Sequence, residues 1–226
     1  MTAGLTEINF FDTSANRRGE ARAALIERFV PNETKVADFR QFGHAYFDDP
    51  SYGVGYGGYA YDGRYKANVE KMVAHYALRP GQRVLEIGCA KGFVLCEFRK
   101  LGFEVRGVDA SAYAVSQAVP EVREFVFNRS CVELPFEDAS FDLVYSKETL
   151  PHLSVAELAK AIPEIKRVAK SANMFLELQT AETDRERRLI RSWDETHQTV
   201  ESAQWWRDFL ASLDFAGQVH FKRLFP

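Results

Sequence analysis

Cysteine is scarce in this chain of 226 residues, and long apolar runs are missing. The three cysteines, Cys89, Cys96 and Cys131, form neither a Cys-x-x-Cys pair nor a Cys/His cluster with zinc spacing, which argues against a disulfide framework and a structural zinc site. No window reaches the roughly 18 consecutive apolar residues of a membrane-spanning helix, and no long apolar run follows a basic start at the amino terminus. We therefore expect a cytoplasmic protein with no membrane partner.

An excess of positive charge is also missing. The chain has 29 Lys and Arg against 32 Asp and Glu, a net charge of −3, whereas nucleic-acid-binding surfaces cluster basic residues against phosphates. A basic run over residues 185–191 is interrupted by Glu186, and we interpret it as the solvated face of a helix that also carries acids. We expect a small-molecule partner, no nucleic acid, and a monomer or homodimer.

The first part of the chain differs in character from the rest. Helical patterns span residues 18–30 and 33–47, and tyrosines alternate with glycines in residues 51–65. Glycine allows sharp turns or the close approach of a ligand, while tyrosine supplies a flat apolar face with a polar tip. The Gly/Tyr-rich segment is either a packed connecting loop or a lid over a small-molecule site. We predict a helical arm and lid over residues 1–65, and one compact core with a carboxyl-terminal cap segment over residues 66–226.

Beyond about residue 80, short apolar segments alternate with helical ones. A parallel sheet that is covered on both faces requires nearly continuous apolar strands separated by helices. We therefore predict an α/β fold with a doubly wound, mostly parallel sheet, in which a single clear strand candidate follows residue 179. The predicted strands are 84–88, 105–110, 125–130, 141–146, 174–179 and 217–225, and the predicted helices in this part are 66–76, 93–102, 111–119 and 155–170.

The segment 84–93 indicates a ligand site. It reads as a strand, a turn containing Gly88 and Gly92, and the start of a helix, the arrangement in which an open α/β sheet binds a nucleotide-like ligand against free backbone N–H groups. Asp109 closes the next strand about 20 residues further on, where a carboxylate can accept hydrogen bonds from both ribose hydroxyls. The turn, the spacing and the acid together predict a nucleoside-containing ligand.

These motifs resemble those of the class I S-adenosylmethionine-dependent methyltransferases. Glu86-x-Gly88-x-Ala90-x-Gly92 is similar to the first motif of that family, Asp109 falls at its ribose-binding acid, and residues 134–144 resemble the run that precedes and forms its fourth strand. The similar segment covers residues 66–179. The resemblance implies a Rossmann-like methyltransferase fold, S-adenosyl-L-methionine as cofactor, and a transferase that methylates a small molecule.

The resemblance also implies where the cofactor binds. Its methionine end is expected near the first motif, its ribose at Asp109, its adenine near the following residues, and its sulfonium near the end of the fourth strand. Arg64 can pair with the cofactor carboxylate, or simply with Asp62. The full expected set is Glu86, Gly88, Cys89, Ala90, Gly92, Asp109, Ala110, Ser111, Ser130, Cys131, Ser146 and Arg64.

Two of these positions depart from the family pattern. Ala90 replaces the middle glycine, which is expected to cost little because a single methyl group can be accommodated. Ser130 stands where the family often has an aspartate that contacts the adenine amino group, so adenine recognition is expected to rest on a hydroxyl and backbone N–H groups instead.

The candidate catalytic residues follow the fourth strand. His152 is the first choice as a general base, because imidazole titrates near neutral pH; the alternative is a structural role at the start of the next helix. Lys147 and Glu148 are the next candidates, with Lys147 able to attract an acidic acceptor. No cluster of acids at helical spacing indicates a metal, so we predict none. The candidate substrate-binding residues are Tyr56, Tyr59, Tyr61, Trp193 and His197.

Several classes of protein share parts of this motif pattern. A dehydrogenase would need Gly-x-Gly-x-x-Gly at the first turn. A nucleic-acid methyltransferase that grips a flipped base would carry an Asn/Asp-Pro-Pro-Tyr/Phe motif where this chain has Ser146-Lys147-Glu148-Thr149. A nucleic-acid or protein methyltransferase and a non-catalytic cofactor-binding module of the same fold stay open as alternatives. We predict methyl transfer to an oxygen or nitrogen of a small polar metabolite, such as a sugar or an acidic precursor of a natural product or surface polysaccharide.

Overall fold

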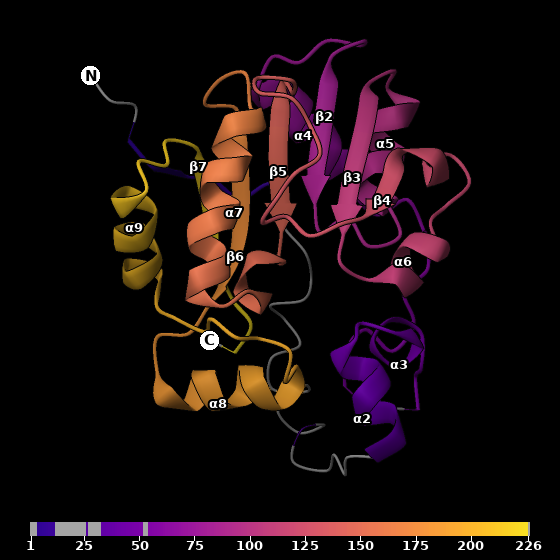
Figure 1. Ribbon diagram of the computed structural model, residues 1–226, viewed down its shortest axis with the longest axis vertical. Helices are drawn as coiled ribbons and strands as arrows, with labels where there is room; N and C mark the ends of the chain where they lie inside the picture. Colours follow the sequence, from indigo (N-terminus) through magenta and orange to yellow (C-terminus); the bar gives the residue numbers. More distant parts are fainter. Residues whose placement is uncertain (1–3, 12–25, 27–32, 52–53, 226) are drawn as a thin grey trace.

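The computed structural model describes residues 4–11, 26, 33–51 and 54–225. The described strands form one seven-stranded sheet in the order β1-β7-β6-β5-β2-β3-β4, in which all neighbours are parallel (Figure 1). This confirms the predicted α/β fold with a doubly wound sheet. The strands are β1 (Thr6–Glu7), β2 (Arg83–Ile87), β3 (Glu104–Asp109), β4 (Val126–Asn128), β5 (Leu143–Lys147), β6 (Met174–Thr180) and β7 (Gln218–Arg223).

Helices flank the sheet and extend beyond one of its ends (Figure 1). None of the described helices is long and apolar enough to cross a membrane. The helix expected over residues 18–30 lies outside the described residues except at residue 26. The described helices of four or more residues are α2 (Glu33–Arg40), α3 (His44–Phe47), α4 (Lys66–His75), α5 (Phe93–Lys100), α6 (Ala112–Ser116), α7 (Val155–Val168), α8 (Asp184–Trp193) and α9 (Ala203–Ser212).

Two apolar clusters hold the helices against the sheet. Val84 of β2 and Leu143 of β5 pack with α4 and α5 on one face. The adjacent residues Leu85 and Val144 pack with α7 and α9 on the other face. Successive side chains of a strand point to opposite faces, so one apolar run serves both clusters. The sheet is therefore buried on both sides, as its continuous apolar strands predicted.

Helix α7 begins with a capping box. The Ser154 hydroxyl accepts a hydrogen bond from the backbone N–H of Glu157, whose carboxylate accepts from the N–H of Ser154, which satisfies two free donors at the helix start. Leu158, Ile162 and Ile165 recur at spacings of three and four and are fully buried. The cap fixes where the helix starts, and thereby brings Glu157 to the carboxyl end of β5.

The free edge of the sheet is completed from the start of the chain. β1 pairs with β7, with Thr6 opposite Gln218. Phe10 and Phe11 follow it into the core, where their rings lie 4.9 and 6.0 Å from that of Phe175. The single terminal strand expected from the sequence is β7, and the short amino-terminal strand takes the place beside it.

The arm lies beyond the carboxyl ends of the central strands, next to α8 (Figure 1). The segment 33–47, expected as one helix, divides into α2 and α3 because the chain turns at Phe42, whose φ is 53°. The Asp38 carboxylate accepts a hydrogen bond from the N–H of Ala45 at 2.6 Å and so caps the start of α3. A Cβ at Gly43 would lie 2.0 Å from this carboxylate, so a larger residue there would have to displace the Asp38 side chain.

Candidate active site

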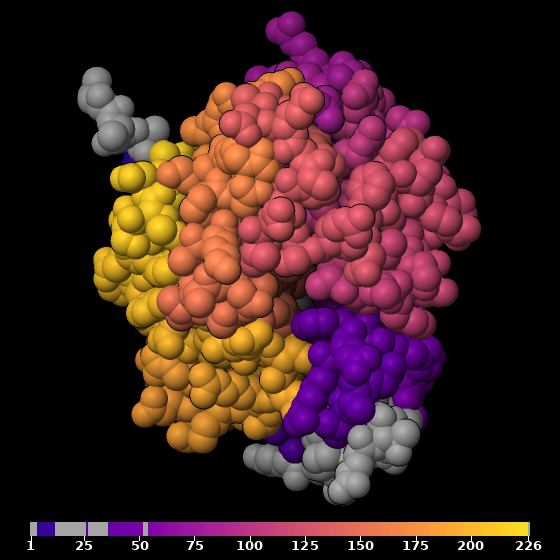
Figure 2. Space-filling model, in the orientation of Figure 1, coloured from indigo at the N-terminus to yellow at the C-terminus, as the bar shows by residue number. Residues whose placement is uncertain are grey.

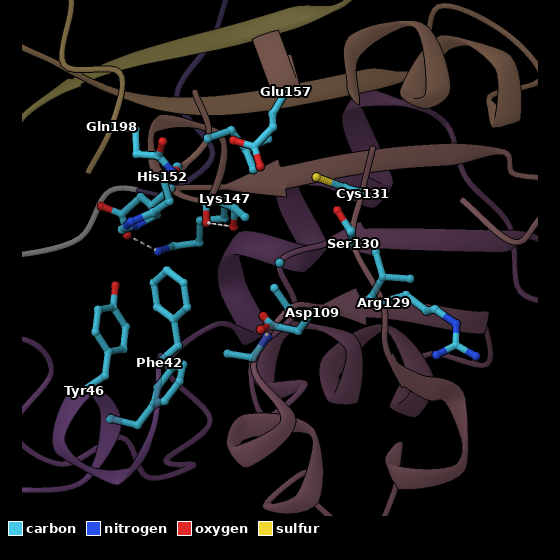
Figure 3. Close-up of a pocket in the computed structure, with 18 of the residues that line it drawn as sticks. Phe42, Tyr46, Asp109, Arg129, Ser130, Cys131, Lys147, His152, Glu157 and Gln198 are labelled. Atoms are coloured by element: carbon cyan, nitrogen blue, oxygen red, sulfur yellow. Dashed lines mark hydrogen bonds and ion pairs between the residues drawn. The ribbon is translucent and has the colours of Figure 1, made fainter. Parts of the chain in front are cut away.

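A cavity opens where the arm faces the carboxyl ends of β2, β3 and β5 (Figure 2). Phe42 and Tyr46 point from the arm toward His152, while Asp109 and Ser130 lie on the other side (Figure 3). The lining residues come from the arm, from the ends of β3 and β5, from the turns after β2, β3, β4 and β5, from the start of α7, and from the segment after α8. They are Phe42, Tyr46, Phe47, Tyr56, Gly88, Ala90, Val108, Asp109, Ala110, Arg129, Ser130, Cys131, Lys147, Glu148, Thr149, His152, Leu153, Glu157 and Gln198.

The turn after β2 depends on glycine. Gly88 and Gly92 have φ values of 74° and 75°, a conformation that side chains disfavour. A Cβ at Gly88 would lie 1.9 Å from the Thr149 hydroxyl, so no side chain fits between β2 and β5. Ala90 also has a positive φ of 46°. The backbone of Ala90 is therefore held in a conformation that favours glycine. This strain lowers the free energy of unfolding by about 1 kcal/mol.

Asp109 ties this turn to the end of β3. Its carboxylate accepts hydrogen bonds from the backbone N–H groups of Ala90, at 2.7 Å, and Ser111, at 2.8 Å. Burial raises the pKa of Asp109, and the two N–H donors partly offset that rise. An ionised carboxylate offers about four lone-pair positions, so two remain for hydroxyl groups. The residues present thus fit the ribose of a nucleoside cofactor.

Glu86 lies beneath the same turn. Its side chain is buried, and its Oε2 atom has no hydrogen-bond partner among the described residues. Burial raises the pKa of Glu86 to about 8, although Tyr145 and Lys147 oppose the rise, because a charged carboxylate is costly in an apolar interior. A buried acid with one unpartnered oxygen at this position fits a cofactor that carries an amino group.

Lys147 and Glu148 form part of a buried ionic network at the ends of β5, β6 and β7. The Lys147 ammonium lies 2.5 Å from Glu148 and 3.7 Å from Glu177. Lys222 contacts the same two carboxylates, and His220 lies 3.0 Å from Glu177. Two lysines face two glutamates, so the positive charge of Lys147 is already balanced within the protein.

The protonation states in this network follow from the pairing. Burial alone would lower the pKa of Lys147, but the nearby Glu148 and Glu177 hold it well above its ordinary value. Burial alone would raise the pKa of Glu148, but Lys147 and Lys222 hold it well below its ordinary value. Both side chains are therefore charged at neutral pH, and neither is poised to exchange a proton there.

His152 lies at the other side of the cavity in a polar cluster. Its Nδ1 atom is 2.8 Å from the Thr196 hydroxyl, and that hydroxyl is 2.5 Å from Asp194. The ring of His197 packs 4.1 Å from that of His152. Burial and then His197 lower the pKa of His152 to about 4, although Asp194 opposes the change. The imidazole is therefore neutral at pH 7, with one ring nitrogen unprotonated.

The same cluster contains possible metal ligands. Ligand atoms of His152, Asp194 and His197 all lie within 4.8 Å of one another. Each side chain also has a protein partner: Thr196 for His152, Tyr46 for Asp194, and Gln179 for His197. This pairing favours a hydrogen-bonded cluster over a metal site.

The structure brings ten of the predicted site residues to the cavity wall. They are Tyr56, Gly88, Ala90, Asp109, Ala110, Ser130, Cys131, Lys147, Glu148 and His152. The other predicted residues do not line this cavity, and they lie beneath it or outside it. These are Glu86, Cys89, Gly92, Ser111, Ser146, Arg64, Tyr59, Tyr61, Trp193 and His197.

Some residues of the second group have clear structural partners. Arg64 is exposed and pairs with Asp62 at 2.6 Å. Tyr59 stacks on Phe93 with ring centroids 4.5 Å apart. The Tyr61 hydroxyl contacts Glu97 and Lys100. The buried Ser111 hydroxyl caps α6 and donates to the carbonyl of Phe42 at 2.6 Å, which attaches the arm to the core.

Several lining residues were not expected from the sequence. Phe42 and Tyr46 reach the cavity only because the arm folds over it. Glu157 was detectable, because Ser154-x-x-Glu157 is a capping-box pattern that marks the helix start after β5. Arg129 and Gln198 carry no local pattern that distinguishes them from other surface residues.

Comparisons with known proteins agree with this architecture. Residues 85–176 match a family described as a methyltransferase domain. An uncharacterized methyltransferase of Synechocystis sp. is 33% identical over 44% of this chain and 47% of its own. Malonyl-[acyl-carrier protein] O-methyltransferase of Erwinia billingiae is 31% identical over 55% of this chain and 49% of its own. The chain spans about half the length of these curated relatives.

Solved structures share the fold. The YcgJ protein from Bacillus subtilis aligns with a TM-score of 0.54 and 25% identity, over 64% of this chain and 66% of its own. Geranyl diphosphate C-methyltransferase from Streptomyces coelicolor, solved with S-adenosyl-L-homocysteine, aligns with a TM-score of 0.54 over 65% of this chain and 58% of its own. At 15% identity the second alignment supports the fold alone.

Proposed function

From the premise that residues 85–176 form a class I S-adenosylmethionine-dependent methyltransferase domain, we propose that the chain moves a methyl group to an oxygen or nitrogen atom of a small polar metabolite. The family match supports S-adenosyl-L-methionine as the cofactor of this domain. The observation that carries the proposal is a single cavity with a ribose-type carboxylate, Asp109, on one side and a neutral imidazole, His152, on the other.

The first side of the cavity suits the cofactor. Gly88 and Ala90 would lie against its methionine part, Asp109 would hold the ribose hydroxyls, and Ser130 and Cys131 would border the adenine. The bound cofactor supplies an electrophilic methyl group on a sulfonium. The protein's own part is then to orient the acceptor and exclude water, because displacement at the methyl group needs alignment more than bond activation.

The second side suits the acceptor. Phe42, Tyr46 and Tyr56 supply aromatic walls from the arm, and His152 offers a neutral imidazole to take the proton of a hydroxyl. Because Glu148 neutralises Lys147, the wall carries no free positive charge from this pair. We therefore favour an uncharged hydroxyl-bearing acceptor, such as a sugar, over an acidic one. The relative from Erwinia billingiae is named as an O-methyltransferase, which supports attack by oxygen.

The test is methyl transfer from radiolabelled S-adenosylmethionine to panels of sugars, hydroxy acids, amines, a peptide mixture and RNA. We expect incorporation into hydroxyl compounds that is lost in a His152→Gln variant while cofactor binding by calorimetry persists. Incorporation into peptide or RNA alone would refute the small-molecule assignment. Tight cofactor binding without turnover on any panel would favour a non-catalytic module.

A further inference from the structure

We propose that Asp194 and Thr196 act as positioning residues that hold the proton of neutral His152 on Nδ1 and leave Nε2 as its basic nitrogen. This inference rests on the proposed function in one respect, namely that His152 serves there as the general base. The protonation pattern itself follows from the hydrogen bonds of the cluster.

Asp194 is surrounded by donors. Its Oδ2 atom accepts a hydrogen bond from the Tyr46 hydroxyl at 2.8 Å, and its Oδ1 atom accepts from the Thr196 backbone N–H at 3.0 Å. The His197 ring nitrogen Nδ1 lies 3.5 Å from Oδ2. A carboxylate that meets several donors is ionised, and an ionised carboxylate can only accept hydrogen bonds. Asp194 is buried, so water does not compete for these positions.

The Thr196 hydroxyl therefore has one possible hydrogen-bond arrangement. Its oxygen lies 2.5 Å from Asp194 Oδ1, and a hydrogen must lie between two oxygens at that distance. Since the carboxylate has none to give, Thr196 donates its single hydrogen to Asp194. Its remaining contact, to His152 Nδ1 at 2.8 Å, must then be one in which the hydroxyl oxygen accepts. The Nδ1 atom of His152 consequently carries a hydrogen.

The consequence falls on the other ring nitrogen. A neutral imidazole carries one hydrogen, so a hydrogen on Nδ1 leaves a lone pair on Nε2. The side chain lines the cavity. Among the described residues its ring makes one hydrogen bond to a side chain, through Nδ1, and the Thr196 backbone also faces the ring. Phe42 meets the ring edge-on at 5.5 Å and limits how far the ring can turn. The ring is therefore oriented before an acceptor arrives.

Charged and titratable groups around His152 act on its pKa in opposite directions: His197 lowers it, whereas Asp194 and Glu148 raise it, and burial together with His197 outweighs them. His197 and Asp194 face it from the segment after α8, Glu148 from the end of β5, and Tyr46 from the arm. The ring stays neutral at neutral pH. Only a neutral ring has one protonated and one unprotonated nitrogen, so the tautomer is defined under these conditions. The cluster thus works as a chain from Asp194 through Thr196 to His152, although the three lie far apart in sequence.

The test reads the tautomer directly. The chain has five histidines, so ¹⁵N-labelled histidine in the full chain gives a small set of long-range ¹H–¹⁵N ring correlations at pH 7.5, and His152→Gln assigns one of them. We expect the His152 pattern of a protonated Nδ1 and an unprotonated Nε2. In Thr196→Val the proton should shift toward Nε2, and in the matched Thr196→Ser variant the wild-type pattern should return. A hydrogen on Nε2 in the wild type, or no change in Thr196→Val, would overturn the inference.

The same spectra separate the inference from a metal site. Adding Zn²⁺ or EDTA should leave the His152 correlations unchanged; a change that depends on the metal and requires Asp194 and His197 would overturn the hydrogen-bond assignment. Once an acceptor is found, Thr196→Val should lower kcat at least about tenfold with little change in cofactor binding, and Thr196→Ser should restore it. An unchanged kcat would refute the positioning role. If no acceptor reacts but the tautomer is as expected, the proposed function fails and the protonation pattern stands.

Discussion

The backbone N–H of Ala90 donates a hydrogen bond to Asp109 Oδ2 at 2.7 Å. This contact joins the glycine turn after β2 to the acid at the end of β3, two parts of the site that the sequence places on separate strands. The carboxylate therefore has two tasks, because it stabilises the turn and presents its remaining lone pairs to the cavity.

Replacing Asp109 with alanine should weaken cofactor binding. We expect the Kd for S-adenosylhomocysteine to rise at least about tenfold, or about 1.4 kcal/mol, because ribose acceptors are lost and the turn is loosened. Calorimetry measures this directly. The matched control is Glu104→Gln, an exposed acid at the opposite end of the same strand, which should bind normally. Equal affinities in Asp109→Ala and wild type would refute the ribose assignment.

Ala90→Gly should stabilise the protein. The φ of Ala90 is 46°, so glycine removes a backbone strain, and the gain should be up to about 1 kcal/mol after the greater freedom of the unfolded glycine chain is subtracted. Urea unfolding provides the measurement. Ala159→Gly, at an exposed position inside α7, should instead destabilise by about 1 kcal/mol. Destabilisation by both substitutions would contradict the strain at Ala90.

Glu86 should make the cofactor-free protein less stable as pH rises. Its folded pKa is about 8, above the value of about 4.3 of an unfolded glutamate, so the folded state holds the proton more tightly. Stability is then fully present below about pH 4 and is lost as pH rises toward 8. Melting temperatures between pH 5 and 8.5 should fall, and Glu86→Gln should flatten the profile. A profile that the substitution leaves unchanged would show that Glu86 is hydrated or paired.

His152 should affect turnover and acid stability but not cofactor binding. Its folded pKa of about 4 lies below the unfolded value of about 6.5, so its contribution to stability is present above pH 6.5 and is lost as pH falls toward 4. Turnover should accordingly show no titration of His152 between pH 6 and 8. His152→Gln should lower kcat by about 10²- to 10⁴-fold. A loss confined to the KM of the cofactor would place His152 outside the chemistry.

The position of the arm against the core should depend on the ion pair between Asp48 and Lys91. Their charged groups lie 2.6 Å apart, and the Tyr113 hydroxyl donates to the same carboxylate at 2.7 Å. Asp48→Asn should therefore release the arm, which limited proteolysis would detect as faster cleavage within residues 33–61. Asp62→Asn, which breaks an exposed pair with Arg64, is the control and should cleave at the wild-type rate. Equal cleavage rates in the Asp48→Asn and Asp62→Asn variants would show that this ion pair does not hold the arm.

The fold was largely predictable because its determinants are local. Apolar runs at strand length, helical spacing in α7 and the glycines after β2 each act within a few residues, so each predicted strand of the sheet was found within three residues of its expected ends. The edge was less predictable: β1 is two residues long and is stable only because β7 lies beside it.

The sequence by itself determined the α/β class, the glycine turn, the ribose-type acid Asp109 and the candidate base His152. Only the tertiary structure decided what surrounds them. It balances Lys147 with Glu148, Glu177 and Lys222, orients His152 through Thr196, and carries Tyr46 to Asp194. Charge pairing and hydrogen bonding act over a few ångströms in space, whereas these partners lie tens of residues or more apart along the chain. Local pattern therefore locates the candidate site residues, and long-range packing sets their protonation and orientation.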